Sequence, residues 1–130
     1  MTGWRWINRQ ALLLLHAESL AEHGGAVGMR DSGLLDSALA RAKNLAAYSE
    51  DTLDVAALAA AYGAGISQNH PFVDGNKRAA FLSVGLFLRL NDYRLVARQA
   101  DATVVVLALA AGEIDEAEFA AWLRQHLVKR

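Results

Sequence analysis

The sequence predicts an almost entirely helical protein. Proline, which a helix interior excludes, occurs once in 130 residues, at position 71. Most of the remaining chain spaces its apolar residues three or four apart and interrupts them with glycine or short polar residues, which is the pattern of amphipathic helices. With 54% hydrophobic composition, 130 residues suffice for one buried core. We expect a single compact all-α domain over residues 1–130, with about six helices and one short strand pair.

The first helices are predicted from residues suited to capping their ends. Asn8 caps a first helix that the pair Gly24-Gly25 ends. Asp31 or Ser32 caps a second helix, which is rich in leucine and alanine. Thr52 caps a third. Because the third helix is rich in alanine and glycine, we expect neighbouring helices to approach it closely and surround it.

The second half of the chain predicts three more helices. The third helix should stop near residue 70, because Pro71 biases the residue before it toward extended backbone. A fourth helix over 76–90 is hydrophobic nearly all round and is expected to be the buried core helix. Asp101 opens a fifth, and Asp115 with Glu118 forms a capping box for a sixth. The short segment Tyr93–Val96 is predicted to be a strand that pairs with residues 4–7.

Composition argues against several functional classes. Thirteen basic and fourteen acidic residues give a net charge of −1, without the basic excess of a nucleic-acid-binding protein. The absence of cysteine excludes disulfides and thiolate metal sites. The apolar run at 11–15 is interrupted by His16 and Glu18, so it is too short for a signal-peptide core or a membrane span. We therefore expect a cytoplasmic protein with neither a membrane nor a nucleic acid as partner.

One segment carries residues suited to chemistry on phosphates. The nine residues from 70 to 78 read HPFVDGNKR and describe a helix end, a tight loop and the first turn of a new helix. Unpaired N–H groups and the helix dipole favour phosphate at such a terminus. Lys77 and Arg78 add charge there, and Gly75 lets a phosphate approach the backbone. Two positive side chains at a helix N-terminus are repelled by the positive end of the helix dipole. An anionic ligand therefore explains their presence better than a solvated turn does.

The remaining residues of the segment suggest a division of labour. Asp74 is suited to hold Mg²⁺, although a helix cap is an alternative role for it. His70 is suited to take a proton from an attacking hydroxyl at neutral pH. Asn76 can orient phosphates or help to bind the metal, while Phe72 anchors the loop in the core. Neither a P-loop nor a glycine-rich dinucleotide fingerprint occurs in the chain.

This segment resembles the signature of the Fic domain superfamily, and in particular of its death-on-curing (Doc) branch of toxins. The stretch 24–35 is also Doc-like, so the resemblance covers most of the chain. The resemblance implies a compact helical toxin that uses ATP and Mg²⁺. In it, His70 is the catalytic base, Asp74 lies at the metal, and the run Asn76-Lys77-Arg78 contacts the phosphates.

Two departures from the adenylyltransferase pattern define the predicted activity. Lys77 replaces a glycine of that pattern, and Phe81 stands where a second arginine falls. In the Doc branch this change accompanies ATP-dependent protein kinase activity. The resemblance therefore implies transfer of the γ-phosphoryl group of ATP to a hydroxyl of another protein. The implied target is a translation protein of the elongation factor Tu type, whose modification halts translation. The alternatives are adenylylation of a protein hydroxyl from the same site and a catalytically idle module that binds an antitoxin and regulates transcription.

The resemblance also implies inhibition by another protein. Many Fic proteins carry an inhibitory Ser/Thr-x-x-x-Glu-Gly/Asn motif, which this chain lacks. We therefore expect a Phd-like antitoxin that folds on the toxin. We interpret His16, His23 and His126 as surface or packing residues, since none has metal-ligand spacing. Arg30-Asp31 is interpreted as a turn with a local ion pair, with contact between Arg30 and the nucleotide or target as the less favoured alternative.

Overall fold

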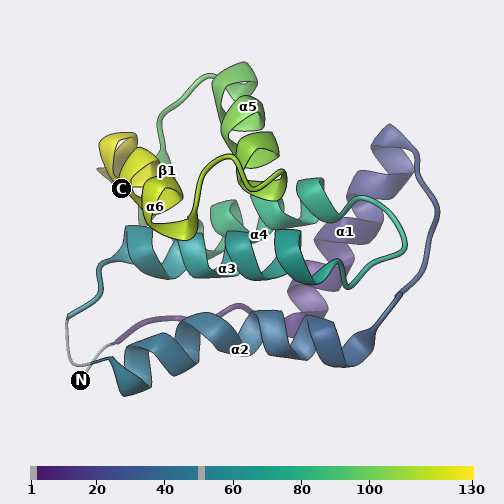
Figure 1. Cartoon of the computed structure of the whole chain (residues 1–130), viewed down its shortest axis with the longest axis horizontal. Coiled ribbons are helices and arrows are strands. Elements are labelled where there is room, and N and C mark those ends of the chain that lie inside the picture. The colour runs from purple at the N-terminus through teal and green to yellow at the C-terminus, as the bar shows by residue number, and fades with distance from the viewer. Residues whose placement is uncertain (1–2, 50–51) are drawn as a thin grey trace.

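Six helices and one small antiparallel sheet make up the described part of the chain (Figure 1). The structure is a computed structural model that describes residues 3–49 and 52–130. The predicted all-α class and the number of helices are confirmed. In chain order the elements are α1 (Arg9–His23), α2 (Ser32–Tyr48), α3 (Val55–Asn69), α4 (Asn76–Leu90), β1 (Tyr93–Leu95), α5 (Gln99–Ala110), α6 (Glu116–Gln125) and β2 (Leu127–Lys129).

Helix α3 lies at the centre of the fold. In Figure 1 it runs between α2 below and α5 and α6 above, and twelve of its fifteen residues are buried. Glycine permits this closeness, because a Cβ on Gly65 would lie 3.3 Å from the Cα of Ala38 in α2. The prediction of a surrounded third helix is confirmed. The expectation that α4 is buried all round is wrong, because Gly85 and Arg89 lie on an exposed side of it.

Helix boundaries follow the capping residues, with one correction. Asn8 caps α1 by accepting from the backbone N–H groups of the first turn, and Asp31, rather than Ser32, caps α2. Thr52 does not cap α3. The carboxylate of Asp54 accepts from the third residue of the helix at 2.9 Å instead. Asp54 also pairs with an arginine of α6, so a tertiary contact helps to decide where α3 begins.

At the last two helices, one predicted capping residue is confirmed and one is corrected. The predicted capping box of Asp115 and Glu118 at α6 is confirmed. Helix α5, however, begins at Gln99, so Asp101 lies within its first turn rather than before it. There the Asp101 carboxylate pairs with Arg98 at 3.0 Å and complements the positive end of the helix dipole.

The predicted strand at 93–96 pairs with a different partner. β1 pairs antiparallel with β2 near the C-terminus and not with residues 4–7. The N-terminal segment is held instead by Asn91, whose side chain accepts from the N–H of Arg5 and donates to its carbonyl. Trp6 then stacks on Phe87 with the ring centroids 5.9 Å apart. Core packing therefore outcompetes strand pairing for this segment.

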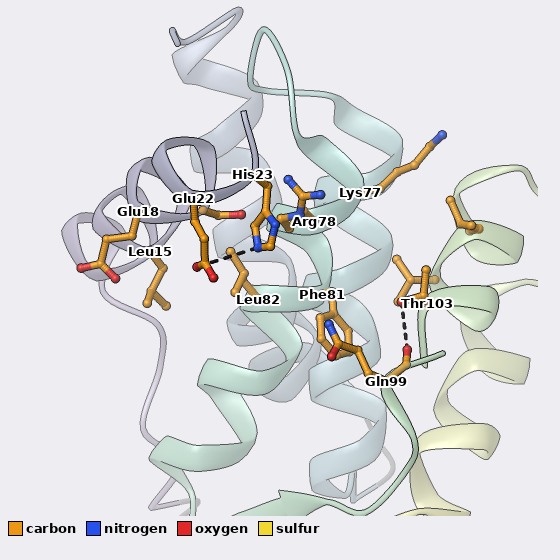
Figure 2. A pocket seen from close by; sticks show the side chains of 13 residues that line it. Leu15, Glu18, Glu22, His23, Lys77, Arg78, Phe81, Leu82, Gln99 and Thr103 are labelled. Atoms are coloured by element: carbon orange, nitrogen blue, oxygen red, sulfur yellow. Dashed lines mark hydrogen bonds and ion pairs between the residues drawn. The ribbon is translucent and has the colours of Figure 1, made fainter. Parts of the chain in front are cut away.

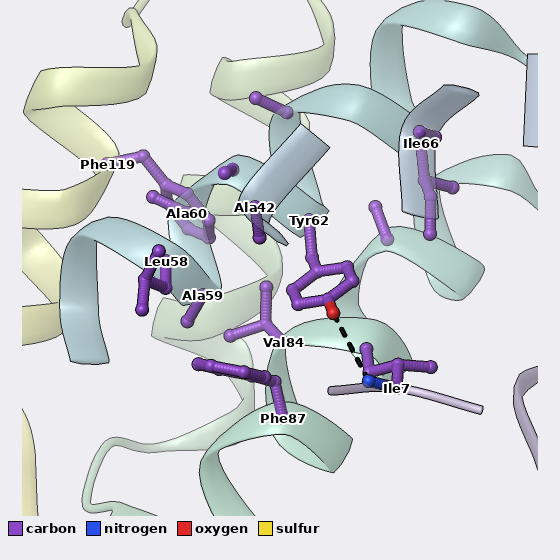
Figure 3. Packing of buried hydrophobic residues seen from close by; sticks show 14 of the residues in the cluster. Ile7, Ala42, Leu58, Ala59, Ala60, Tyr62, Ile66, Val84, Phe87 and Phe119 are labelled. Carbon is purple, nitrogen blue, oxygen red and sulfur yellow. Dashed lines mark hydrogen bonds between the residues drawn. The ribbon is translucent and has the colours of Figure 1, made fainter. Parts of the chain in front are cut away.

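No helix in residues 3–49 and 52–130 combines the length and the hydrophobicity needed to cross a bilayer. The buried residues instead form a hydrophobic cluster to which all six helices contribute. Figure 3 shows part of this cluster, in which the rings of Tyr62 and Phe87 lie 5.1 Å apart and the side chain of Val84 packs beside them. The cluster joins the N-terminal segment to α3 and α4.

Replacing Tyr62 by phenylalanine should lower the free energy of unfolding by about 1–3 kcal/mol. The Tyr62 hydroxyl is buried and accepts the backbone N–H of Ile7 at 3.1 Å, so its removal leaves that buried N–H without a partner (Figure 3). Urea denaturation measures the loss. Tyr48→Phe is the matched control, because Tyr48 is 84% exposed. Equal losses in the two variants would contradict this role of the hydroxyl.

Candidate functional site

His70 ends helix α3 in a left-handed conformation. It is the C-cap residue, with φ 49° and ψ 56°, and its N–H donates to the carbonyl of Ile66 at 3.2 Å. The extended backbone that Pro71 favours for this position is therefore not adopted. A left-handed residue closes the helix and turns the chain sharply. It opens the loop of residues 70–75, here called the motif loop, which joins α3 to α4.

The connection between α1 and α2, residues 24–31, lies along the motif loop. Met29 forms an isolated antiparallel bridge with Phe72, and the N–H of Val73 donates to the carbonyl of Gly28 at 3.1 Å. The predicted ion pair within Arg30-Asp31 is wrong, because the Arg30 guanidinium donates to the carbonyls of residues 69 and 70 instead. The two segments therefore form one braced unit, although some forty residues separate them in sequence.

A buried histidine lies beneath the motif loop. His16 is 5% exposed, and its ring stacks on Phe72 with the centroids 3.8 Å apart. Its Nε2 lies 2.9 Å from the carbonyl oxygen of Asp74. Since a carbonyl can only accept, this nitrogen carries the hydrogen. His16 is thus a packing residue, as expected, but it also fixes the loop that carries Asp74, which its sequence position gave no means of predicting.

Asn76 uses its side chain to brace the loop. Its Oδ1 accepts from the N–H of Phe72, and its Nδ2 donates to the carbonyl of the same residue, both at 2.9 Å. The amide therefore braces the loop, and Asn76 also presents its backbone N–H at the start of α4. Phe72, only 2% exposed, is held between this amide and His16.

Asp74 presents an ionised carboxylate at the surface of the loop. Its Oδ2 accepts from the N–H of Ala26 at 3.1 Å and its Oδ1 from the N–H of Gly75 at 2.8 Å. These backbone hydrogen bonds lower the pKa of Asp74, with the Ala26 bond as the largest cause. Each carboxylate oxygen keeps further acceptor capacity for a cation. Residues 3–49 and 52–130 contain no cluster of three or more His, Asp or Glu side chains placed to hold a metal ion.

An open cavity of about 380 Å³ brings the predicted site residues together. Gly75, the N-cap of α4, is left-handed, and a Cβ there would lie 3.2 Å from Nε2 of His16. No side chain in the described chain caps this helix, so its first N–H groups remain available to an anion. The lining residues are His23, Gly24, His70, Asp74, Gly75, Asn76, Lys77 and Arg78. Of these, His23 was expected only as a surface or packing residue.

A second groove of about 510 Å³ adjoins the cavity and shares His23, Lys77 and Arg78 with it. Figure 2 shows Phe81 in this groove, one turn of α4 beyond the two cations. Its walls come from α1, α4 and α5, with acidic side chains such as Glu22 on the α1 side. Position 81 thus presents an aromatic ring to the groove and not a guanidinium.

The carboxyl of Asp74 should titrate below its ordinary value of 3.8 in the folded chain. A depressed pKa means that the charged form contributes stability above the unfolded-state pKa and that this contribution is lost as the pH falls through the folded-state pKa. An NMR titration of the Asp74 carboxyl carbon measures the value, with the urea-unfolded chain as reference. A folded value at or above the unfolded one would show that the two backbone hydrogen bonds do not form in solution.

Comparison with known proteins places this site in a family. The model of the Fic/DOC family matches residues 6–88, which include the whole 70–78 segment. The chain is 35% identical over 121 residues to the Protein kinase doc of Escherichia phage P1, covering 93% of this chain and 94% of that protein. It is 40% identical over 85 residues to the Toxin Doc of Mycolicibacterium smegmatis, covering 65% of this chain and 64% of that protein. The chain therefore belongs to the Fic/DOC family.

Proposed function

We propose that this protein is a Doc-like toxin that transfers the γ-phosphoryl group of ATP to a hydroxyl of another protein. The observation that carries the proposal is the single cavity lined by His70, Asp74, Lys77 and Arg78. It combines a base, a carboxylate and two cations at a helix N-terminus. The name of the first relative, a protein kinase, supports phosphoryl transfer, and the name of the second supports action as a toxin.

The phosphates would lie at the N-terminus of α4. The uncapped N–H groups of its first turn point the positive end of the helix dipole at the cavity, and Lys77 and Arg78 add two formal charges. Asp74, held ionised by its backbone donors, would bind Mg²⁺. When bound, the ion would neutralise negative charge on the phosphate oxygens. Nucleotide and metal thus share one binding surface.

His70 would act as the general base. It takes the proton of the acceptor hydroxyl as the new oxygen–phosphorus bond forms, while the bond from the γ-phosphorus to the bridging oxygen breaks and ADP leaves. Lys77 and Arg78 stabilise the charge that collects on the phosphate oxygens during this exchange. The chain thereby supplies positioning and electrostatics, which are the main protein contributions to phosphoryl transfer.

Position 81 favours phosphoryl over adenylyl transfer. An aromatic ring cannot hold a phosphate as a guanidinium would, so the phosphates are clamped only near Lys77, Arg78 and the helix end. This changes which phosphorus lies beside His70. The proposed target is a translation protein of the elongation factor Tu type, with action in the cytoplasm.

A Phd-like antitoxin is the proposed inhibitor. The groove beside the cavity is lined by apolar side chains, among them Phe81 and Leu107, and by charged side chains, among them Glu22 and Lys77. A partner segment lying in this groove would cover Lys77 and Arg78 and so block the phosphate site. Inhibition in trans is consistent with the absence of an inhibitory motif from this chain.

The His70→Ala variant should lower kcat by about two to four orders of magnitude, because the general base is lost. Intact mass spectrometry of elongation factor Tu after incubation with ATP and Mg²⁺ provides the measurement. We expect a phosphoryl-sized gain with the native chain. His126→Ala is the control, since that histidine caps α6 and stacks on Trp122, away from the cavity lining. An adenylyl-sized gain would refute the kinase activity, and no gain would refute this target.

The Asp74→Asn variant should need a higher Mg²⁺ concentration for half-maximal activity, because the neutral amide is a poorer ligand for a hard cation. Activity is measured against Mg²⁺ at saturating ATP. Asp36→Asn is the control, as its carboxylate is exposed and paired with Arg9 on the outside of α2. An unchanged Mg²⁺ dependence in Asp74→Asn would remove the metal-binding role from this residue.

A further inference from the structure

We propose that Arg30 is a positioning residue for His70. Its guanidinium holds the end of α3 in the left-handed conformation that places His70 at the lining of the cavity. The inference rests on the proposed catalytic function of His70, which it deepens. It assigns to an exposed arginine of the α1–α2 connection a part in the geometry of the site.

The backbone conformation of His70 requires stabilising contacts from outside its own helix. A residue that precedes proline is biased toward extended backbone, and a left-handed conformation is uncommon for residues other than glycine. His70 nevertheless has φ 49° and ψ 56°. Within the described ranges, the only other non-glycine residue with positive φ is Asp92, in the turn before β1. Such a conformation persists where surrounding contacts over-determine it, and it often marks a functional site.

Those contacts come from Arg30 and its neighbour. The Nε of Arg30 donates to the His70 carbonyl at 2.6 Å, and its Nη2 donates to the Asn69 carbonyl at 2.7 Å. The backbone N–H groups of Arg30 and Asp31 both donate to the carbonyl of Pro71, at 2.7 and 3.0 Å. Three successive carbonyls around the turn are thus held from one side.

The chemistry of arginine suits this role. The carbonyls at the end of a helix lack intrahelical donors and carry the negative end of its dipole, so a cation is favoured there. The guanidinium is planar and spans two acceptors at once, whereas the ammonium of a lysine acts as a point charge. Both donors are charge-assisted, which agrees with the short distances.

The side chain can be changed without disturbing the core. Arg30 is exposed and belongs to a connection rather than to a helix, so its truncation removes little buried surface. The backbone bonds from Arg30 and Asp31 to Pro71 do not depend on the side chain. A variant therefore keeps the loop in place while it releases the two carbonyls before the proline. The effect should reach His70 and not the phosphate cations.

The test compares Arg30→Gln and Arg30→Lys with Arg41→Gln in the full chain. Arg41 is a matched control, because it is also solvent-accessible and pairs with Glu116 outside the cavity. With elongation factor Tu, ATP and Mg²⁺, we expect kcat to fall about tenfold to a hundredfold in Arg30→Gln with little change in the KM for ATP. Arg30→Lys should recover part of the loss, and the urea midpoint should stay close to that of Arg41→Gln.

NMR of His70 supplies a readout that does not depend on turnover. The Cα chemical shift reports backbone conformation, so it should move in Arg30→Gln and stay in place in Arg41→Gln. A native shift and native kcat in Arg30→Gln would overturn the proposal, as would a loss confined to KM. If neither the native chain nor His70→Ala transfers a group, the proposed function fails, and the His70 shift alone then decides whether Arg30 holds this turn.

Discussion

The stack of His16 on Phe72 is the contact on which the geometry of the site depends. It places a ring from α1 beneath the loop between α3 and α4, and the same histidine donates to the carbonyl of Asp74. Because the two rings are buried, the loop cannot shift without exposing apolar surface or leaving a polar atom unpaired. The amide of Asn76 holds Phe72 from the other side.

The central helix makes this arrangement possible. Alanine and glycine along α3 let α2 and α4 approach it closely, so that the end of α3 and the start of α4 lie on either side of one short loop. His70 at the end of the first helix and Lys77 and Arg78 at the start of the second then line the same cavity. The short loop between the two helices keeps these groups near one another, and the close packing of α3 against its neighbours holds the helix that carries His70 in place.

The start of α4, where we propose that phosphate binds, carries two features that lower the stability of the helix. Lys77 and Arg78 lie in the first turn, where positive charges oppose the helix dipole, and Gly75 offers no capping side chain. Such local conflicts are expected at functional sites, where stability is given up for binding. An anion would relieve both conflicts, since it accepts from the free N–H groups and neutralises the two cations.

The helical class, most helix ends and the composition of the candidate site could be predicted from the amino-acid sequence. These features are local: a capping box spans four residues, and the groups at 70–78 lie within nine. Contacts between segments far apart in the chain could not be predicted in this way, because they depend on how the helices pack. His16 reaches Asp74 across 58 positions, Arg30 reaches His70 across 40, and β1 pairs with the C-terminal strand rather than with the N-terminal segment. The left-handed turn at His70 follows from the same cause, because contacts from another part of the chain there outweigh the local preference that proline imposes.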